Sequence, residues 1–176
     1  DGKTDTFFLE RPNSPEGEAV QALYPSRRLS WPNNPPRTLL LVSALPGEGT
    51  TTVALNLSYA RAQHANTGLV DADLRKGRVA GAFSLATGQG LGDVLTGNAM
   101  LENSLLEIHG MSNLSVLQAG RSKGNFGQLI CSEKMEQTLA ALRERLGFVI
   151  NDSAPIRTFV DGTALSTRAD AVVQGG

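Results

Sequence analysis

Residues 38–52 read Thr-Leu-Leu-Leu-Val-Ser-Ala-Leu-Pro-Gly-Glu-Gly-Thr-Thr-Thr, and this stretch decides the fold. The continuous apolar run 39–42 is typical of a buried central strand in a parallel sheet. A glycine-rich turn follows it, and a helix is predicted to begin directly after the turn. This order of strand, glycine loop and helix is that of a phosphate-binding loop (P-loop), whose backbone N–H groups surround the phosphates at the helix N-terminus.

The loop lacks the lysine that normally reaches the β- and γ-phosphates. Thr50 occupies the lysine position, and Thr51 occupies the position of the Ser or Thr that holds Mg²⁺. A charge-assisted hydrogen bond is worth roughly 1.5–3 kcal/mol, so its loss lowers nucleotide affinity by about 10- to 150-fold. The stretch therefore predicts a phosphate-binding fold with a weakened phosphate site.

Strands and helices alternate after the loop, which predicts an α/β fold: a mostly parallel central sheet flanked by helices on both faces. Further strands are expected at residues 69–70, 114–117, 148–150 and 171–173. Asp71, Asp73 and Asp152 each follow one of these strands. Because ligands bind at the carboxyl ends of parallel strands, we expect the loop and the three aspartates to converge on one site. The alternative is that the glycines only make a turn and the aspartates only cap helices.

Apolar spacing predicts two helices. The first follows the loop and places on one face Val53, Leu57 and Ala60. The second has Ser132 as a suitable N-cap and repeats apolar side chains at Met135, Leu139, Leu142 and Leu146.

Composition excludes several classes of function. With 16 Lys and Arg against 17 Asp and Glu, the formal charge of −1 gives no argument for a nucleic-acid partner. The single cysteine rules out an intrachain disulfide framework and suits a reducing cytosol. No apolar stretch approaches the roughly 18–20 residues of a membrane span, and no secretory signal is visible. These features favour a cytoplasmic domain.

Six of the eight prolines lie in residues 1–37. Such density excludes a long helix and predicts a proline-rich N-terminal arm, followed by the P-loop domain over residues 38–176. The chain starts at Asp1 rather than Met and stops soon after its last predicted strand. We therefore expect a fragment that is truncated at its C-terminus.

Further motifs follow the loop in a fixed order: Asn56-Leu57, Val70-Asp71-Ala72-Asp73-Leu74-Arg75-Lys76-Gly77, Gly90-Leu91-Gly92-Asp93-Val94-Leu95-Thr96-Gly97, Leu117-Gln118-Ala119-Gly120, Asn125-Phe126-Gly127-Gln128-Leu129-Ile130 and Val149-Ile150-Asn151-Asp152-Ser153-Ala154-Pro155. This series resembles the cytosolic domain of the bacterial tyrosine autokinases (BY-kinases), which regulate capsule and exopolysaccharide synthesis and export. The family's motifs are a P-loop of type P-G-x-G-K-[ST], a D-x-D motif, and a Walker B motif in which D-x-x-P follows three apolar residues.

The resemblance implies a site for ATP or ADP with Mg²⁺. It assigns Mg²⁺ to Thr51, Asp71 and Asp152, and it groups Asp73 with the two other aspartates as catalytic. Nucleotide contacts are implied for Pro46, Gly47, Glu48, Gly49, Thr50, Thr51, Thr52 and Arg75. Among these, Arg75 is the best remaining cation near a bound phosphate.

The chain departs from the family pattern at several positions besides Thr50. Asn151 stands where the family has an apolar residue, and Ala154 replaces the first proline of a pair. Related ATPases that position division sites have a second lysine at the position of Leu45. The family's oligomerisation motif E-x-x-R-x-x-R aligns with Glu18, Gln21 and Tyr24, so only the glutamate remains. We therefore expect a monomer or small oligomer in isolation rather than a closed ring.

Two functions stay open. The favoured one is a degenerate regulator that acts through contacts with a membrane polysaccharide co-polymerase or export component, with weak or absent ATP turnover. The alternative is an active Mg-ATP-dependent tyrosine autokinase that uses a substituted cation. The chain has only two tyrosines, Tyr24 and Tyr59, and neither belongs to a tail cluster.

Four other side chains have simple structural interpretations. Tyr59 is expected to pack inside the domain rather than to accept phosphate. His64 and His109 have no partner cluster and are expected on the surface. Cys131 has no nearby histidine and is expected to be a small core residue.

Overall fold

The computed structural model describes residues 36–121, 123–155, 165–166 and 169–175 of the 176-residue chain. The predicted N-terminal arm therefore lies outside the described residues, except for Pro36 and Arg37. No helix in the described part of the chain is both long and apolar enough to cross a membrane.

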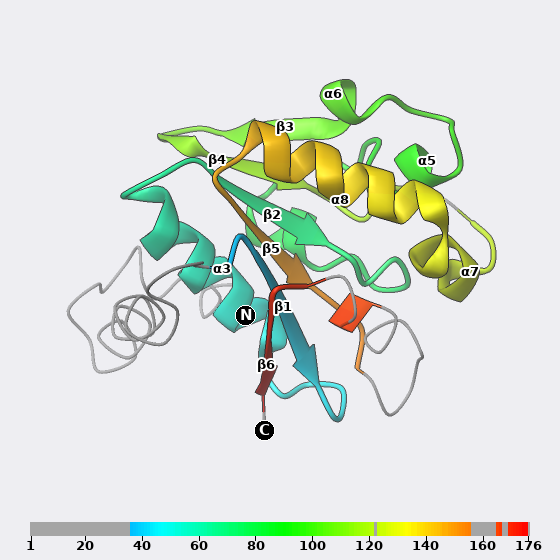
Figure 1. Ribbon diagram of the computed structural model, residues 1–176, viewed down its shortest axis with the longest axis horizontal. Coiled ribbons are helices and arrows are strands. Elements are labelled where there is room, and N and C mark those ends of the chain that lie inside the picture. Colours follow the sequence, from blue (N-terminus) through cyan, green and yellow to red (C-terminus); the bar gives the residue numbers. More distant parts are fainter. Residues whose placement is uncertain (1–35, 122, 156–164, 167–168, 176) are drawn as a thin grey trace.

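A six-stranded sheet forms the centre of the molecule (Figure 1). Its strands are β1 (Thr38–Ser43), β2 (Thr67–Asp71), β3 (Leu105–Ile108), β4 (Met111–Leu117), β5 (Phe148–Asp152) and β6 (Ala171–Gly175). They lie in the order β3-β4-β2-β5-β1-β6, and every neighbouring pair is parallel except β3 and β4. The predicted mostly parallel sheet is confirmed.

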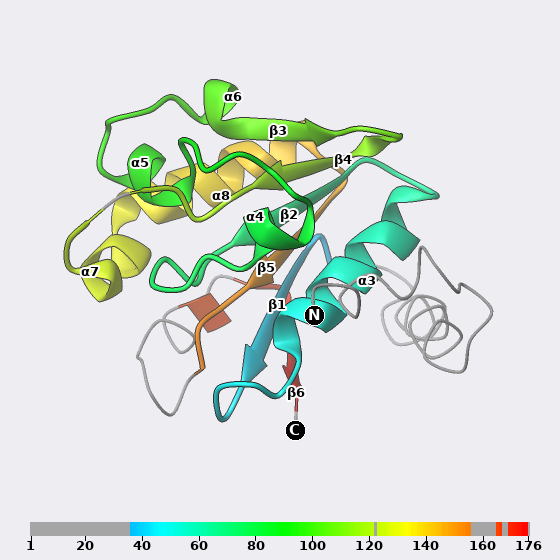
Figure 2. The same cartoon turned by 180° about the vertical axis from the view of Figure 1, so that it is seen from behind.

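Helices cover both faces of this sheet, as predicted. They are α3 (Thr50–Ala62), α4 (Val79–Ala82), α5 (Leu91–Leu95), α6 (Leu101–Ser104), α7 (Phe126–Cys131) and α8 (Glu133–Arg145). In Figure 1, α7 and α8 lie in front of the sheet, whereas α3 and α4 lie in front in the reversed view of Figure 2.

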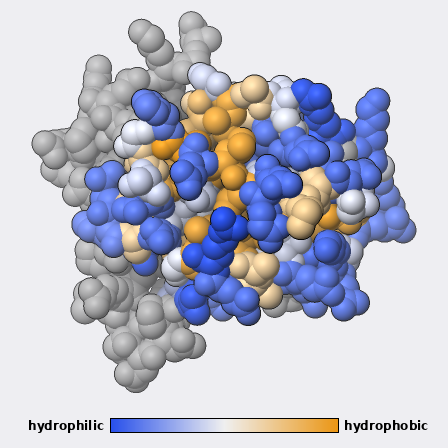
Figure 3. Space-filling model, turned by 90° about the horizontal axis from the view of Figure 1, so that it is seen from above, coloured by the Kyte–Doolittle hydropathy of each residue, from blue (hydrophilic) through white to orange (hydrophobic). Residues whose placement is uncertain are grey.

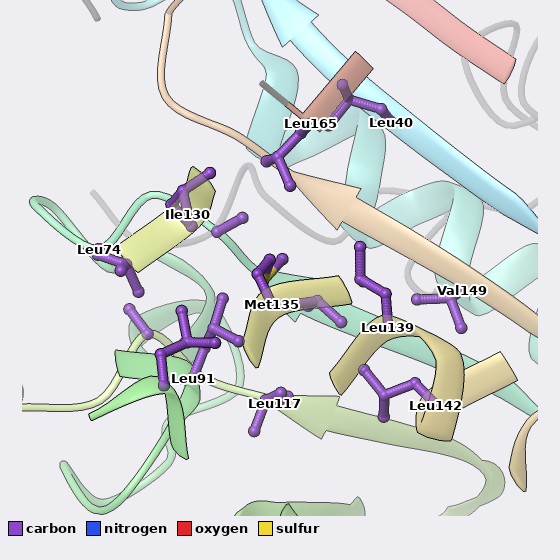
Figure 4. Close-up of a cluster of buried hydrophobic side chains, with 14 of the residues drawn as sticks. Leu40, Leu74, Leu91, Leu117, Ile130, Met135, Leu139, Leu142, Val149 and Leu165 are labelled. Carbon is purple, nitrogen blue, oxygen red and sulfur yellow. The ribbon is translucent and has the colours of Figure 1, made fainter. Parts of the chain in front are cut away.

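Side chains that alternate along the central strands divide into two hydrophobic clusters. Leu39 and Leu41 of β1 belong to the cluster under α3, whereas Leu40 and Val42 belong to the cluster under α8. Figure 4 shows the second cluster, which includes Met135, Leu139 and Leu142 of α8. Burial on both faces requires a continuous apolar run, which is why β1 does not alternate with polar residues.

The second predicted helix is confirmed as α8. The Ser132 hydroxyl accepts a hydrogen bond from the backbone N–H of Met135 at 3.3 Å, so Ser132 is the N-cap. The four predicted apolar positions are buried, and they are Met135, Leu139, Leu142 and Leu146.

The helix after the loop, α3, is buried over more of its circumference than the predicted face of Val53, Leu57 and Ala60. Asn56 and Ser58 are also buried. Their side chains donate hydrogen bonds to carbonyl oxygens one turn earlier in the same helix, at 2.7 Å and 2.6 Å. These bonds give both buried polar side chains a partner within the helix.

The prediction for Tyr59 is confirmed, because its ring is buried and lies 5.4 Å from the ring of Phe83. Burial raises the pKa of Tyr59 to about 12. His64 and His109 are exposed, as predicted.

The prediction for Cys131 was wrong, because its side chain is exposed. It is the last residue of the six-residue helix α7, and the preceding residue, Ile130, takes the buried position.

Two glycine motifs that are distant in the sequence meet beside β4. The N–H of Leu91 donates to the carbonyl of Gln118 at 2.7 Å, and the N–H of Gly92 donates to that of Ala119 at 2.9 Å. A Cβ at Gly90 would lie 2.1 Å from the Gln118 carbonyl oxygen. The close approach of the two backbones therefore requires glycine at position 90.

Strand β3 forms one edge of the sheet. Figure 3 views the molecule from above, on the side of α6 and β3, and shows a band of apolar side chains among polar ones. Met100, which precedes α6, is 66% exposed.

Candidate functional site

The loop between β1 and α3 has the backbone of a phosphate-binding turn. Gly47 and Gly49 have φ values of 92° and 81°, in the left-handed region that favours glycine. Gly49 is the N-cap of α3, so the positive end of that helix dipole faces the loop. A Cβ at either glycine would meet nothing within 4 Å, so their backbone conformation, not crowding, is what requires glycine.

The side chain of Glu48 makes hydrogen bonds within this loop. Its carboxylate accepts hydrogen bonds from the backbone N–H groups of Ala44 at 2.8 Å and Leu45 at 3.1 Å. The side chain is thus used within the loop, and any contact of Glu48 with a phosphate would come from its backbone.

The ends of β2 and β5 bring two of the predicted aspartates together. Asp71 and Asp152 are partners in the parallel register of these strands. The backbone N–H of Ala72 donates to the Asp152 carbonyl at 2.8 Å, which holds the two ends side by side. The Thr51 hydroxyl, in the first turn of α3, donates to the Asp152 carboxylate. Thr51, Asp71 and Asp152 therefore form one group, as expected from the sequence.

Burial controls the charge of this group. Asp71 is fully buried, and burial followed by repulsion from Asp152 raises its pKa to about 8, against a lowering hydrogen bond from the N–H of Val79. Burial also raises the pKa of Asp152 to about 7, and the bond from Thr51 opposes this shift. Two carboxylates at adjacent strand ends do not both ionise readily near neutral pH.

Each of the two buried carboxylates has an oxygen without a partner. Asp71 Oδ1 and Asp152 Oδ1 are inaccessible and make no hydrogen bond within the described part of the chain. Buried polar atoms are rarely left unsatisfied unless something else binds them. The described residues contain no group of three or more His, Cys, Asp or Glu side chains arranged to hold a metal by themselves. The donors fit Mg²⁺, which keeps several waters and is bound through one or two carboxylates together with phosphate oxygens.

A hollow opens beside the loop; Asp73 lines it, whereas the buried Asp71 and Asp152 do not. It is lined by Ser43, Pro46, Gly47, Gly49, Thr50, Thr51, Asp73, Lys76, Arg78, Ser153 and Pro155. Asp73 is half-buried, and its carboxylate accepts hydrogen bonds from the backbone N–H groups of Arg75 and Lys76, each at 3.2 Å. Thr50, the residue at the lysine position, lies in the wall of this hollow.

Arg75 was predicted to be the cation near a bound phosphate, but it does not lie at the hollow. Its guanidinium lies over the ring of Phe126, 5.6 Å from the ring centre, and Arg75 does not line the hollow. Lys76 and Arg78 line it instead. The sequence showed a basic group at residues 75–78, but only the turn at Gly77, with φ of 53°, determines which of its side chains face the loop.

Thr52, which was predicted to contact the nucleotide, and Asn151, a departure from the family pattern, do not line the hollow. Thr52 is half-buried in the first turn of α3, and its carbonyl accepts the bond from Asn56. Asn151 is buried beside Asp152; its amide donates to the Leu39 carbonyl at 3.4 Å and its Oδ1 has no partner within the described residues. Ser153 lines the hollow although no sequence pattern marked it as a site residue, and its hydroxyl donates to the Leu41 carbonyl at 3.2 Å.

The shifted carboxyl groups predict an unusual pH dependence of stability. Asp71 and Asp152 bind protons more readily in the folded chain than in the unfolded chain, where the pKa of aspartate is near 3.9. Their contribution to stability is thus fully present below about pH 4 and is lost as the pH rises toward about 8. Asp71→Asn keeps an acceptor for Val79 and removes the charge. We expect it to raise the melting temperature at pH 8, without Mg²⁺, and to change it much less at pH 5. Circular dichroism measures this, and an equal loss of stability at both pH values would contradict it.

The strand, glycine loop and helix, with aspartates at the ends of two neighbouring strands, define a P-loop NTPase-like α/β domain. The tyrosine-protein kinase YwqD of Bacillus subtilis is 30% identical to this chain over 170 residues, which cover 96% of the chain and 71% of YwqD. The chain therefore belongs to the family of bacterial tyrosine kinases.

Other comparisons agree with this assignment. The tyrosine-protein kinase CpsD of Streptococcus pneumoniae is 32% identical over 140 residues, which are 78% of this chain and 61% of CpsD. The chain thus spans less than two thirds of that relative. The crystal structure of the chimerical protein CapA2B2 superposes with a TM-score of 0.90 at 29% identity, covering 97% of this chain and 75% of that protein. No protein-family model matches the chain.

Proposed function

We propose that this chain is a degenerate BY-kinase-type regulator of bacterial exopolysaccharide synthesis or export, with weak or absent binding of Mg-nucleotide and little or no turnover of ATP. The observation that supports this most is the place of Thr50. It lines the hollow together with the loop glycines and Asp73, at the position where the family has a lysine. A threonine hydroxyl is neutral and short, so it cannot neutralise charge on a transferred phosphate.

The remaining residues fit a Mg-nucleotide. The backbone N–H groups of the loop would take the phosphates, and Pro46 would shape its entrance. The Thr51 hydroxyl and the free oxygens of Asp71 and Asp152 would hold Mg²⁺ and its waters, with Asp73 at the rim. When bound, Mg²⁺ neutralises part of the phosphate charge. Within the protein, Thr51 and Asp152 orient each other through their hydrogen bond.

The partner in this proposal is a membrane polysaccharide co-polymerase or export component, on the cytoplasmic side of the inner membrane. Family membership supports this assignment, and the formal charge of −1 gives no support for a nucleic-acid partner. Autophosphorylation has few acceptors in this chain. Tyr59 is buried, and Tyr24 lies outside the described residues. In this proposal the domain therefore acts through contacts with its partner, and in isolation it is a monomer or a small oligomer.

A second candidate is an active Mg-ATP-dependent tyrosine autokinase that uses a substituted cation. The specific observation in its favour is that Lys76 and Arg78 line the same hollow as Thr50.

Turnover distinguishes the two candidates. The chain and, in parallel, its variant Asp152→Asn are incubated with Mg²⁺ and ATP labelled on the γ-phosphate. The variant removes the carboxylate that accepts the hydrogen bond from Thr51. We expect no label on tyrosine and the same background hydrolysis from both proteins, since the transferring phosphate lacks its lysine. Hydrolysis by the unmodified chain that is several-fold faster than by Asp152→Asn would contradict the regulator and favour the kinase.

A further inference from the structure

The turn between the D-x-D motif and α4 is held at both ends by the site itself. At its start, the Asp73 carboxylate accepts from the N–H groups of Arg75 and Lys76. At its end, the N–H of Val79 donates to Asp71 Oδ2 at 3.0 Å. The backbone on both sides of position 78 is thereby held by the carboxylates of Asp73 and Asp71.

Gly77 sets the direction of this turn. Its φ of 53° is left-handed, and a Cβ there would lie 3.1 Å from the Cβ of Ala119. A side chain at this position would be strained and crowded, so the turn keeps its shape only with glycine. This geometry turns Arg78 toward the hollow, while Arg75 remains over Phe126.

Arg78 faces the loop with its donors available. It lines the hollow together with Thr50 and Thr51, and its guanidinium forms no hydrogen bond to any residue that the structure describes. Its charge lowers the pKa of Asp152, which places it within electrostatic reach of the acidic pair. An exposed arginine near carboxylates, and beside a P-loop that has no basic residue, is available to a phosphate that binds between them.

We propose that the guanidinium of Arg78 supplies the positive charge for the phosphates of a bound nucleotide, in place of the lysine that is absent at position 50. The inference rests on the proposed weak nucleotide site. Lys76 lines the same hollow, but a planar guanidinium binds phosphate with two parallel hydrogen bonds, which an ammonium cannot form. Arg78 thus binds the phosphates from the turn before α4, and not from the glycine loop.

The test measures the dissociation constant of Mg-ADP with the full 176-residue chain by calorimetric titration. We expect Arg78→Gln to weaken binding by about 10-fold or more, as for the loss of a charge-assisted hydrogen bond. Arg145→Gln is the control, because it removes the same charge at the end of α8. This residue lies close in sequence to the amino end of β5, away from the carboxyl strand ends that carry the site. The control should leave the affinity within about two-fold. Thermal unfolding checks that each variant is folded.

A double-mutant cycle makes the assignment specific. If Arg78 replaces the lysine, Arg78→Gln should lose much of its effect in the Thr50→Lys background, because the two cations serve the same phosphates. Equal effects in both backgrounds, or an effect of Arg75→Gln in place of Arg78→Gln, would overturn the assignment. Absence of Mg-ADP binding to the unmodified chain at millimolar concentrations would also overturn it, while leaving the proposed regulator intact. Low-micromolar binding that depends on Arg78 would support the assignment and contradict the weak site.

Discussion

Thr50→Lys is expected to tighten Mg-ATP binding by about 10-fold or more, the scale of one restored charge-assisted hydrogen bond. Thr50 is the first residue of α3 and lines the hollow, so a lysine at this position would enter the space that we propose for the phosphates. The rest of the loop already has its left-handed glycines and helix N-terminus. The substitution therefore adds the missing charge to a turn that is otherwise complete.

Calorimetric titration of both proteins with Mg-ATP measures this effect. Ser112→Lys is a matched control, because it adds the same charge at an exposed position near the amino end of β4. Its affinity should stay close to that of the unmodified chain. If Thr50→Lys binds no better than this control, the hollow itself does not accept a nucleotide. Asn151, buried beside Asp152 with an unpaired oxygen, is then the first position to change.

Gly90→Ala is expected to destabilise the fold by about 3 kcal/mol or more. The reason is contact and not backbone strain, since φ at Gly90 is −160° and any residue adopts it. The new Cβ would lie 2.1 Å from the Gln118 carbonyl oxygen and 2.5 Å from the Gly120 nitrogen, and both atoms belong to backbone. Relief would require separating the two segments that are joined by the hydrogen bonds of Leu91 and Gly92.

Urea unfolding of Gly90→Ala and Gly81→Ala tests this. Gly81 lies in α4, and a Cβ there would meet nothing within 4 Å. Its replacement should be neutral or slightly stabilising, because alanine has the higher helix propensity. Similar unfolding midpoints for the two variants would show that the contact at Gly90 does not contribute to stability.

Local sequence predicted the fold well, for a physical reason. A central strand such as β1 is buried on both faces, so its continuous apolar run predicts it. The Ser132 cap and the apolar repeat predict α8. The ends of parallel strands lie at one edge, so the convergence of Asp71 and Asp152 followed from the order of elements alone.

What the sequence could not predict depends on turns and on contacts between distant segments. Arg75 and Arg78 are equivalent in charge, and only the turn at Gly77 separates the one over Phe126 from the one at the hollow. Cys131 was misplaced because the absence of a partner histidine does not indicate burial, and in α7 the neighbouring Ile130 takes the buried position. The hydrogen bonds that the Glu48 carboxylate accepts from the N–H groups of its own loop likewise depend on the backbone conformation of that loop, which the spacing of apolar residues does not predict.

The affinity of the unmodified chain for Mg-ATP tests the central claim most directly. The claim is that the loop and the acidic pair are retained while the loss of the lysine weakens the phosphate site. Calorimetric titration of the 176-residue chain should give a dissociation constant weaker than about 100 µM, or no binding. Binding in the low micromolar range would contradict the claim and restore the active kinase as the better account.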